Sequence, residues 1–140
     1  MRANELMTTP VVTVSLGTPV HEVAELLTKH RITALPVLDA EGRLVGIVSE
    51  GDLLVNRIAA DPRNHLRREA EHPDPPHLVD QVMTSTVVAM GQHADVADVA
   101  NLMLDYDVRS VPIVDGSRVV GIISRRDLIR ALLANTVHSR

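Results

Sequence analysis

The hydrophobic and polar positions of this chain follow one pattern that occurs twice. In the first copy, a short apolar run at 11–14 predicts a strand. Apolar residues then recur at i, i+3, i+4 and i+7, which is the spacing of one helical face: Val20, Val23, Ala24 and Leu27. Two more apolar runs, 35–38 and 44–48, predict strands, and a helix is expected from Glu50 to about Ala60. The pattern therefore predicts a β-α-β-β-α unit.

The second copy repeats the residues of the first as well as their polarity. The segment Met7–Val12 returns as Met83–Val88, Ala34–Asp39 as Ser110–Asp115, and Arg43–Ser49 as Arg118–Ser124. The helical face also returns, as Val96, Val99, Ala100 and Met103. An internal repeat of this kind decides the architecture, because each copy is one supersecondary unit. We divide the chain into repeat one at 1–60, a linker at 61–77 and repeat two at 78–140.

Local signals place the ends of the expected elements. Thr18 is expected to cap the first helix, with Pro19 at its first position. The turn Asp39–Gly42 has a glycine available for positive φ, and Asp115-Gly116 is a tighter version of the same turn.

A strand–helix–strand crossover predicts parallel pairing, and the following tight turn predicts an antiparallel hairpin. Each copy is thus expected to be a small mixed sheet with two helices, which gives an α/β (α+β) fold. The closing helices are apolar over more than one stripe, with Leu53, Leu54, Val55, Ile58 and Ala59 in the first and Leu128, Ile129, Ala131, Leu132 and Leu133 in the second. We expect the copies to pack against each other and some of this surface to be covered in a homodimer.

The linker is rich in proline and histidine, and one short helical turn is expected near 66–70. His65, His72 and His77 fit no common helix or strand face, so no metal site is expected there.

The composition argues against several classes of function. There is no cysteine, which excludes thiol catalysis and thiolate metal sites and suits a cytoplasmic protein. The net charge of −4 argues against general binding to nucleic acid, and no apolar run is long enough to span a membrane. A single tyrosine is the only aromatic residue, so a bound base would lie between aliphatic side chains and proline. The sequence has neither a nucleophile–base pair nor a glycine-rich phosphate loop, so we do not expect an enzyme.

The most informative motif is Gly46-Ile-Val-Ser49-x-x-Asp52, which returns as Gly121-Ile-Ile-Ser124-x-x-Asp127 where a strand runs into a helix. Ser-x-x-Asp at a helix start is a capping-box pattern, so its simplest role is structural. The same geometry suits a ligand, because free N–H groups and the helix dipole favour a phosphate. A carboxylate in the first turn accepts hydrogen bonds from ribose hydroxyls, and the glycine would let a ligand approach the strand.

A cluster of arginines distinguishes the second copy. Arg125 and Arg126 lie in the first helical turn, where cations are disfavoured, and Arg109 is expected nearby. The cluster suits a bound anion; the alternative is that Asp107 and Asp127 neutralise it. Repeat one has Thr33, Glu50 and Gly51 at these positions.

Both copies resemble the cystathionine β-synthase (CBS) domain, and the pair resembles a Bateman module. The resemblance covers about 6–60 and 78–134 and is carried by the Val-Val, Leu-Pro-Val or Val-Pro-Ile, and Gly-Ile-Val/Ile-Ser-x-x-Asp-Leu segments. It implies two repeats packed with pseudo-twofold symmetry, adenosine-containing ligands in clefts between them, and assembly into flat dimers.

The resemblance also implies roles for individual residues. Ser49 and Ser124 would contact phosphate, Asp52 and Asp127 would hold ribose hydroxyls, and Arg109, Arg125 and Arg126 would strengthen phosphate binding in repeat two. The backbone on both sides of the base would come from Thr13, Val14, Ala34, Leu35, Pro36, Val88, Ala89, Ser110, Val111 and Pro112.

The function expected is a non-enzymatic regulatory module that binds an adenine nucleotide such as AMP, ADP or ATP. It needs no other cofactor. A chain of 140 residues leaves no room for an attached catalytic domain, so a separate effector protein is expected to read the ligand state. The alternatives are a constitutive structural adaptor whose Ser-x-x-Asp motifs only cap helices, and a sensor of S-adenosylmethionine or NAD.

Overall fold

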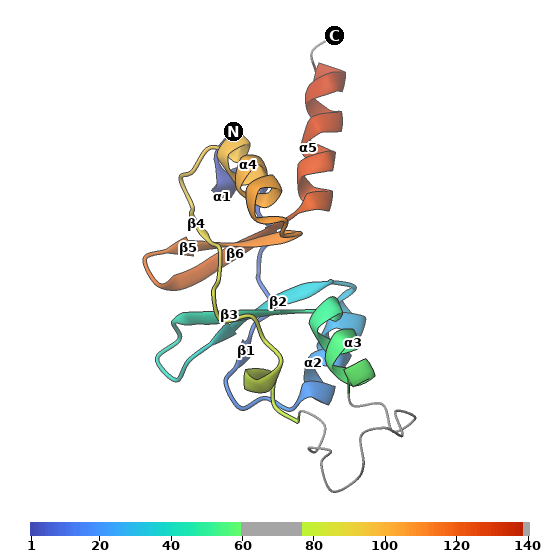
Figure 1. Cartoon of the computed structure of the whole chain (residues 1–140). Helices are drawn as coiled ribbons and strands as arrows, with labels where there is room; N and C mark the ends of the chain where they lie inside the picture. The colour runs from blue at the N-terminus through green and yellow to red at the C-terminus, as the bar shows by residue number, and fades with distance from the viewer. Residues whose placement is uncertain (60–76, 139–140) are drawn as a thin grey trace, which may run out of the picture. The chain divides into compact units, whose positions relative to one another are not determined.

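A computed structural model describes the backbone of residues 1–59 and 77–138, and the side chains of 1–55 and 77–134 (Figure 1). It contains two small mixed sheets of three strands each. The first has the order β1 (Val14–Ser15), β2 (Ala34–Leu38) and β3 (Leu44–Ser49). The second has the order β4 (Met90–Gly91), β5 (Ser110–Asp115) and β6 (Arg118–Ser124). The α/β class is therefore confirmed.

The strand pairing confirms the expected topology. β1 runs parallel to β2, and β2 runs antiparallel to β3; β4, β5 and β6 repeat this arrangement. The expected strand at 11–14 is wrong in position, because only Val14 and Ser15 lie opposite β2. The equivalent strand of the second repeat likewise lies at Met90–Gly91, beyond the Val87-Val88 pair.

Helices cover the sheets. α2 (Val20–His30) and α3 (Glu50–Ala59) follow β1 and β3, and α4 (Val96–Tyr106) and α5 (Arg125–His138) follow β4 and β6. In Figure 1, α4, α5 and the short N-terminal α1 (Ala3–Leu6) lie together on one side of the β4–β5–β6 sheet. The expected helical turn near 66–70, and the histidines at 65 and 72, lie outside the described residues.

Two details of α2 correct the sequence analysis. Thr18 does not cap it: the Thr18 hydroxyl donates to the Ser15 carbonyl (2.7 Å), and Pro19 occupies the N-cap position. Ala24 is exposed, whereas Val23 and Leu27 face the core. In α4 the N-cap is Asp95, whose carboxylate accepts from the Ala97 N–H (2.9 Å), a favourable arrangement at a helix start.

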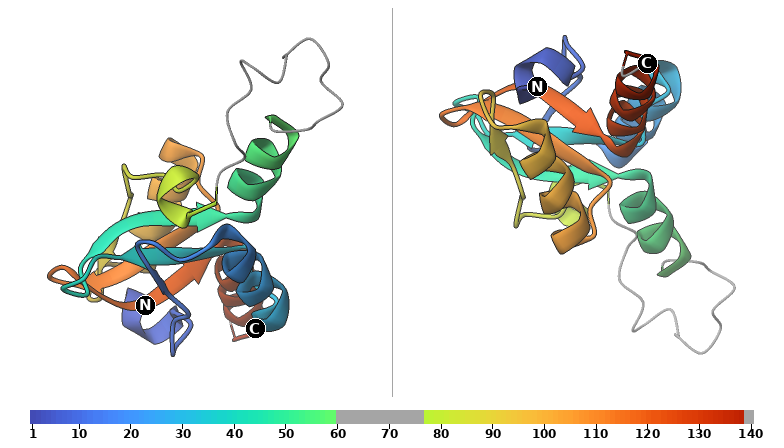
Figure 2. Two further views of the ribbon diagram at one scale, coloured as in Figure 1. Left: turned by 90° about the horizontal axis from the view of Figure 1, so that it is seen from below. Right: turned by 90° about the horizontal axis from the view of Figure 1, so that it is seen from above.

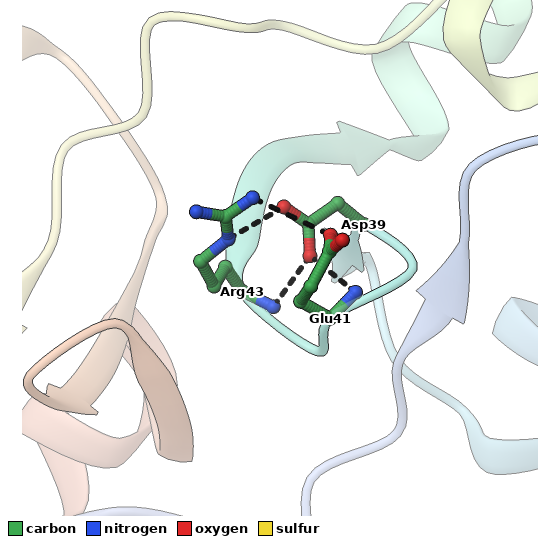
Figure 3. Close-up of polar contacts among 3 residues, drawn as sticks. All are labelled: Asp39, Glu41 and Arg43. Carbon is green, nitrogen blue, oxygen red and sulfur yellow. Dashed lines mark hydrogen bonds and ion pairs between the residues drawn. The ribbon is translucent and has the colours of Figure 1, made fainter.

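The β2–β3 turn is held by one carboxylate (Figure 3). Asp39 Oδ1 accepts from the N–H groups of Arg43 (2.8 Å) and Glu41 (2.9 Å), and Asp39 Oδ2 accepts from Arg43 Nε (2.9 Å). The backbone N–H of Arg43, aided by its guanidinium and the Glu41 N–H, lowers the pKa of Asp39. Gly42 has a φ of +80°, as expected, and Gly116 in the second hairpin has +66°.

The leading segment of each repeat packs in the other repeat. α1 lies beside α4, and both views of Figure 2 show it next to the strands of the second repeat. Thr8 exchanges two backbone hydrogen bonds with Ile122 of β6 (2.8 and 3.3 Å). In the same way Thr84, which follows the 3₁₀ helix η1 (Val79–Gln81), exchanges two with Ile47 of β3 (2.8 and 3.0 Å).

This exchange defines two compact units that differ from the sequence repeats. Unit 1 consists of Met1–Val11 and Val88–Arg140, and unit 2 consists of Val12–Val87. The core of unit 1 contains Ala3, Val99, Met103, Val111, Ile113 and Ile123. The core of unit 2 contains Val14, Val23, Leu27, Leu35, Val37, Val48, Val79 and Val82. Each core thus includes fully or nearly fully buried residues from the leading segment of the other repeat: Ala3 in unit 1, and Val79 and Val82 in unit 2.

Candidate functional site

The second Ser-x-x-Asp motif lies at the junction of β6 and α5, and its two side chains bond to each other. The Ser124 N–H and hydroxyl both donate to Asp127 Oδ2 (2.8 and 3.0 Å). The Asp127 N–H in turn contacts Ser124 Oγ (3.3 Å). Asp127 is only 7% exposed, which is unusual for an aspartate.

The first motif has the same arrangement at the junction of β3 and α3. The Ser49 N–H donates to Asp52 Oδ2 (2.9 Å), and the Asp52 N–H donates to Ser49 Oγ (3.1 Å). Asp52 is half-buried. Both motifs therefore form the reciprocal capping box that the sequence predicts.

The second carboxylate oxygen of Asp127 is less tightly held than the first. Thr8 Oγ1 lies 3.5 Å from Oδ1, and Arg130 Nη1 lies 3.7 Å from it. Both separations exceed those of a strong hydrogen bond to a carboxylate. Since a carboxylate offers about four acceptor positions, Oδ1 retains capacity for donors supplied by a ligand.

The three arginines of repeat two are not equivalent. Arg125 Nε donates to the Val108 carbonyl (3.2 Å), and Arg125 Nη2 lies 3.4 Å from Asp107 Oδ1, so Arg125 ties α5 to the end of α4. Arg109 and Arg126 are exposed. Among the described residues neither side chain has a hydrogen-bond or ion-pair partner. Neutralisation by acidic neighbours, the alternative to an anion site, thus applies to Arg125 through Asp107, while Asp127 pairs with Arg130.

The structure brings two of the segments that are expected to flank a base beside the motifs. Ala34 is the register partner of Ser49, and Ser110 is the register partner of Ser124. The Arg109 carbonyl accepts from the Arg125 N–H (3.0 Å), as the Thr33 carbonyl does from the Glu50 N–H (2.9 Å).

Other predicted contact residues are buried or more distant within their unit. Four have side chains that are fully buried, so only their backbone could meet a ligand: Leu35, Pro36, Val111 and Pro112. The remaining four residues lie on the far side of each sheet from the motif. In the first sheet these are Thr13 and Val14, near β1, and β2 lies between them and β3. In the second they are Val88 and Ala89, just before β4, and β5 lies between β4 and β6.

Two methionines, Met7 and Met83, occupy the space beside the motif glycines, a role that was not predicted from the sequence. A Cβ added at Gly46 would meet Met83 Sδ at 2.5 Å and the Thr84 carbonyl oxygen at 3.2 Å. One added at Gly121 would overlap the Met7 side chain. The expectation that these glycines make room for a ligand is wrong, because they make room for methionine. Met-Thr occurs at the same place in both repeats, which was the available signal.

Within the residues that the structure describes, no three histidine or acidic side chains cluster as metal ligands would. Over the same residues, none of the helices has the length and apolar character needed to cross a bilayer.

Two mixed sheets, each joined to its closing helix through a Ser-x-x-Asp motif, define a tandem of small α/β domains. The profile of the CBS domain matches residues 3–58 and again residues 79–134. The chain therefore belongs to the CBS domain family and contains two such domains.

Two of the similar solved structures contain adenosine compounds. The CBS domain pair of protein MJ0100, in complex with 5′-methylthioadenosine and S-adenosyl-L-methionine, has a TM-score of 0.80 and 27% identity. That comparison covers 96% of this chain and 98% of the other. CBSX2 in complex with AMP has a TM-score of 0.79 and 29% identity, with the same coverage.

The share of a relative's length that this chain covers differs widely from one relative to another. The CBS domain-containing protein YhcV of Bacillus subtilis is 30% identical over 131 residues, which span 94% of this chain and 85% of YhcV. By contrast, the chain spans 31% of a Methanocaldococcus jannaschii relative and 14% of the A-adding tRNA nucleotidyltransferase of Geobacter sulfurreducens. CBS domains thus occur both in proteins of about this size and as a part of larger enzymes.

Proposed function

We propose that this CBS domain pair is a non-enzymatic regulatory module that binds an adenosine-containing ligand, of the AMP, ADP or ATP type. The observation that carries the proposal is the buried Asp127 at the start of α5, with Oδ1 only loosely held. The AMP and S-adenosylmethionine complexes of similar domain pairs support the same ligand class. The net charge of −4 favours a small molecule over nucleic acid.

Each motif residue has a distinct role in this proposal. Asp127 and Asp52 accept hydrogen bonds from the ribose hydroxyls. Ser124 and Ser49 donate to phosphate together with N–H groups at the helix start. The backbone at 34–36 and 110–112, with that at 13–14 and 88–89, flanks the base.

Ligand binding has to compete with the capping bonds. The Ser124 hydroxyl already donates to Asp127, so it must rotate to donate to a phosphate. The exchange replaces one hydrogen bond by another, and such exchanges contribute only about 0.5–1.5 kcal/mol net. Affinity must therefore come mainly from the base, the ribose and charge. A ligand that changes the capping bonds also changes how α3 and α5 begin, which gives a partner protein or domain a conformational difference to read.

A second function is favoured by one observation. Both motifs form complete capping boxes from their own serine and aspartate. A constitutive adaptor would need nothing more from them.

A thermal-shift panel separates the two functions. AMP, ADP, ATP, S-adenosylmethionine, 5′-methylthioadenosine and NAD are compared with GMP and inorganic phosphate. A ligand that binds only the folded state raises the midpoint, by an amount equivalent to about 2.7 kcal/mol at 100 times its Kd. The proposal predicts a shift with at least one adenosine compound, reduced in Asp127→Asn. No shift with any of them would favour the adaptor.

A further inference from the structure

The two helix starts that carry the Ser-x-x-Asp motifs have the same backbone but opposite charge. In unit 2 the N–H of Glu50 donates to the Thr33 carbonyl (2.9 Å), and in unit 1 the N–H of Arg125 donates to the Arg109 carbonyl (3.0 Å). These bonds hold residues 33 and 109 beside the first turns of α3 and α5 in the same way. The two helix starts are therefore equivalent, and each lies within one unit.

The side chains at these equivalent positions are basic in unit 1 and neutral or acidic in unit 2. Unit 1 has an arginine at four positions around its motif: Arg109, Arg125, Arg126 and Arg130. Unit 2 has no basic residue at the corresponding four positions: Thr33, Glu50, Gly51 and Val55. Both units keep the motif aspartate, so the difference in charge comes from these four positions.

Charges at the end of the preceding helix do not cancel the difference. In unit 1, Asp107 Oδ1 lies 3.4 Å from Arg125 Nη2, but the Asp107 side chain is 98% exposed, so solvent screens the pair. In unit 2 the residue at the end of α2 is Arg31, which is exposed and forms no ion pair with another described residue. The Glu50 carboxylate is also exposed and has no hydrogen-bond or ion-pair partner among the described residues.

Local helix stability explains the charge of one helix start and not of the other. A helix N-terminus carries partial positive charge, so acids stabilise it and cations destabilise it. Glu50 therefore stabilises α3 by itself, whereas Arg125 and Arg126 are unfavourable at the start of α5 unless an anion neutralises them. A phosphate brought to α3 would instead meet Glu50 and Asp52 in one turn, and like charges at short distance repel.

We propose that the two motifs of one chain select adenosine compounds of different charge. The motif of unit 1 takes a phosphorylated compound, and the motif of unit 2 takes one without phosphate, either uncharged or positively charged. Resting on the proposed function, in which both aspartates bind ribose, this assignment limits phosphate binding to Ser124. Ser49 keeps its capping bonds with Asp52. One chain can then hold two different ligands at once.

Variants that keep only one motif test the assignment. Asp127→Asn leaves the motif of unit 2 intact, and Asp52→Asn leaves that of unit 1 intact. Each variant, shown by circular dichroism to be folded, is titrated calorimetrically with AMP and with adenosine, which differ only in the phosphate. We expect Asp52→Asn to bind AMP at least about tenfold more tightly than adenosine, and Asp127→Asn to show the reverse order by a similar factor. S-adenosylmethionine, which carries a positive sulfonium, should bind Asp127→Asn more tightly than AMP does.

The outcomes distinguish a failure of this assignment from a failure of the proposed function. The same order of affinity for AMP and adenosine in both variants would overturn the charge selection and leave adenosine binding intact. A folded Asp127→Asn variant that binds none of the three compounds would also overturn the assignment to unit 2. No binding of any of them to the wild type would overturn both.

Charge reversal at α3 tests the cause. Glu50→Arg, made in the Asp127→Asn background, gives α3 the charge that Arg125 gives α5. It should raise the affinity for AMP at least about tenfold and change that for adenosine little, because a repulsive contact with phosphate becomes attractive. Glu22→Arg in the same background is the matched control, since Glu22 is an exposed acid in the first turn of α2 in the same unit. An equal gain for AMP from both substitutions, or none from Glu50→Arg, would overturn the proposal.

Discussion

Single residues decide how closely the exchanged segments approach the sheets. Gly121→Ala should destabilise the protein by about 1–3 kcal/mol, the usual cost of overpacking, because the new methyl group overlaps Met7 along its side chain. Gly46→Ala should cost less, since there only the Met83 sulfur would lie within 3.0 Å of the new methyl group, whereas at Gly121 the Met7 side chain would do so from its sulfur back to Cβ. Urea unfolding measures both, and Gly91→Ala, with open space around it, is the control.

A double-variant cycle gives the cause of that loss. If the Met7 side chain is the obstacle, Gly121→Ala costs much less in a Met7→Ala background, since contacting residues are non-additive. Equal costs in both backgrounds would show that the Met7 side chain is not the obstacle.

Asp39 makes the stability of the β2–β3 hairpin depend on pH. Its pKa is lowered in the folded state, so its stabilisation is complete above the unfolded value of about 3.9 and is lost as the pH falls through the lower folded value. Asp39→Asn should therefore reduce stability at pH 7, and the difference from wild type should shrink below about pH 4. Asp115→Asn, in the second hairpin, is the control, and a difference constant from pH 7 to pH 2.5 would contradict the assignment.

At the scale of elements, the exchange of leading segments determines which fragment of the chain can fold by itself. A chain of residues 12–87 keeps Val79 and Val82 in its core, whereas a chain of 1–60 lacks them. Because burying a valine stabilises by about 1.5–3 kcal/mol, we expect 12–87 to unfold cooperatively and 1–60 to be largely unfolded. Circular dichroism during thermal unfolding measures this, and the reverse order would show that the sequence repeat is the folding unit.

Most elements, but not their exchange, could be predicted from the sequence. The runs at 35–38 and 44–48 and the helical spacing after Val20 are strong local signals, and the structure confirms them. The partner of Met7-Thr8 is not a local property, since β3 and β6 have nearly the same sequence and either could accept it. For the candidate site, the Ser–Asp bonding was predictable from a capping-box spacing, whereas the engagement of Arg125 by Val108 required the fold.

At the scale of the whole molecule, the two motifs are expected to bind phosphate unequally. Because Arg125 is engaged with the end of α4, the asymmetry depends on Arg109 and Arg126. Each should contribute up to about 1.5–3 kcal/mol if it reaches a phosphate, as hydrogen bonds to charged groups do. Arg109→Ala and Arg126→Ala should weaken AMP binding while leaving adenosine binding nearly unchanged, by calorimetric titration.

Arg118→Ala, which removes an exposed arginine of the β5–β6 hairpin, controls for net charge. An equal loss for AMP in all three variants would indicate general charge rather than a phosphate contact.

The most direct test of the proposed function is calorimetric titration of the wild-type chain with AMP, with Asp52→Asn and Asp127→Asn alongside. The proposal predicts saturable binding that Asp127→Asn weakens at least tenfold, corresponding to about 1.4 kcal/mol, while circular dichroism shows both variants folded. Binding unaffected by either substitution, or no saturable binding of AMP or any other adenosine compound of the panel to the folded wild type, would contradict it.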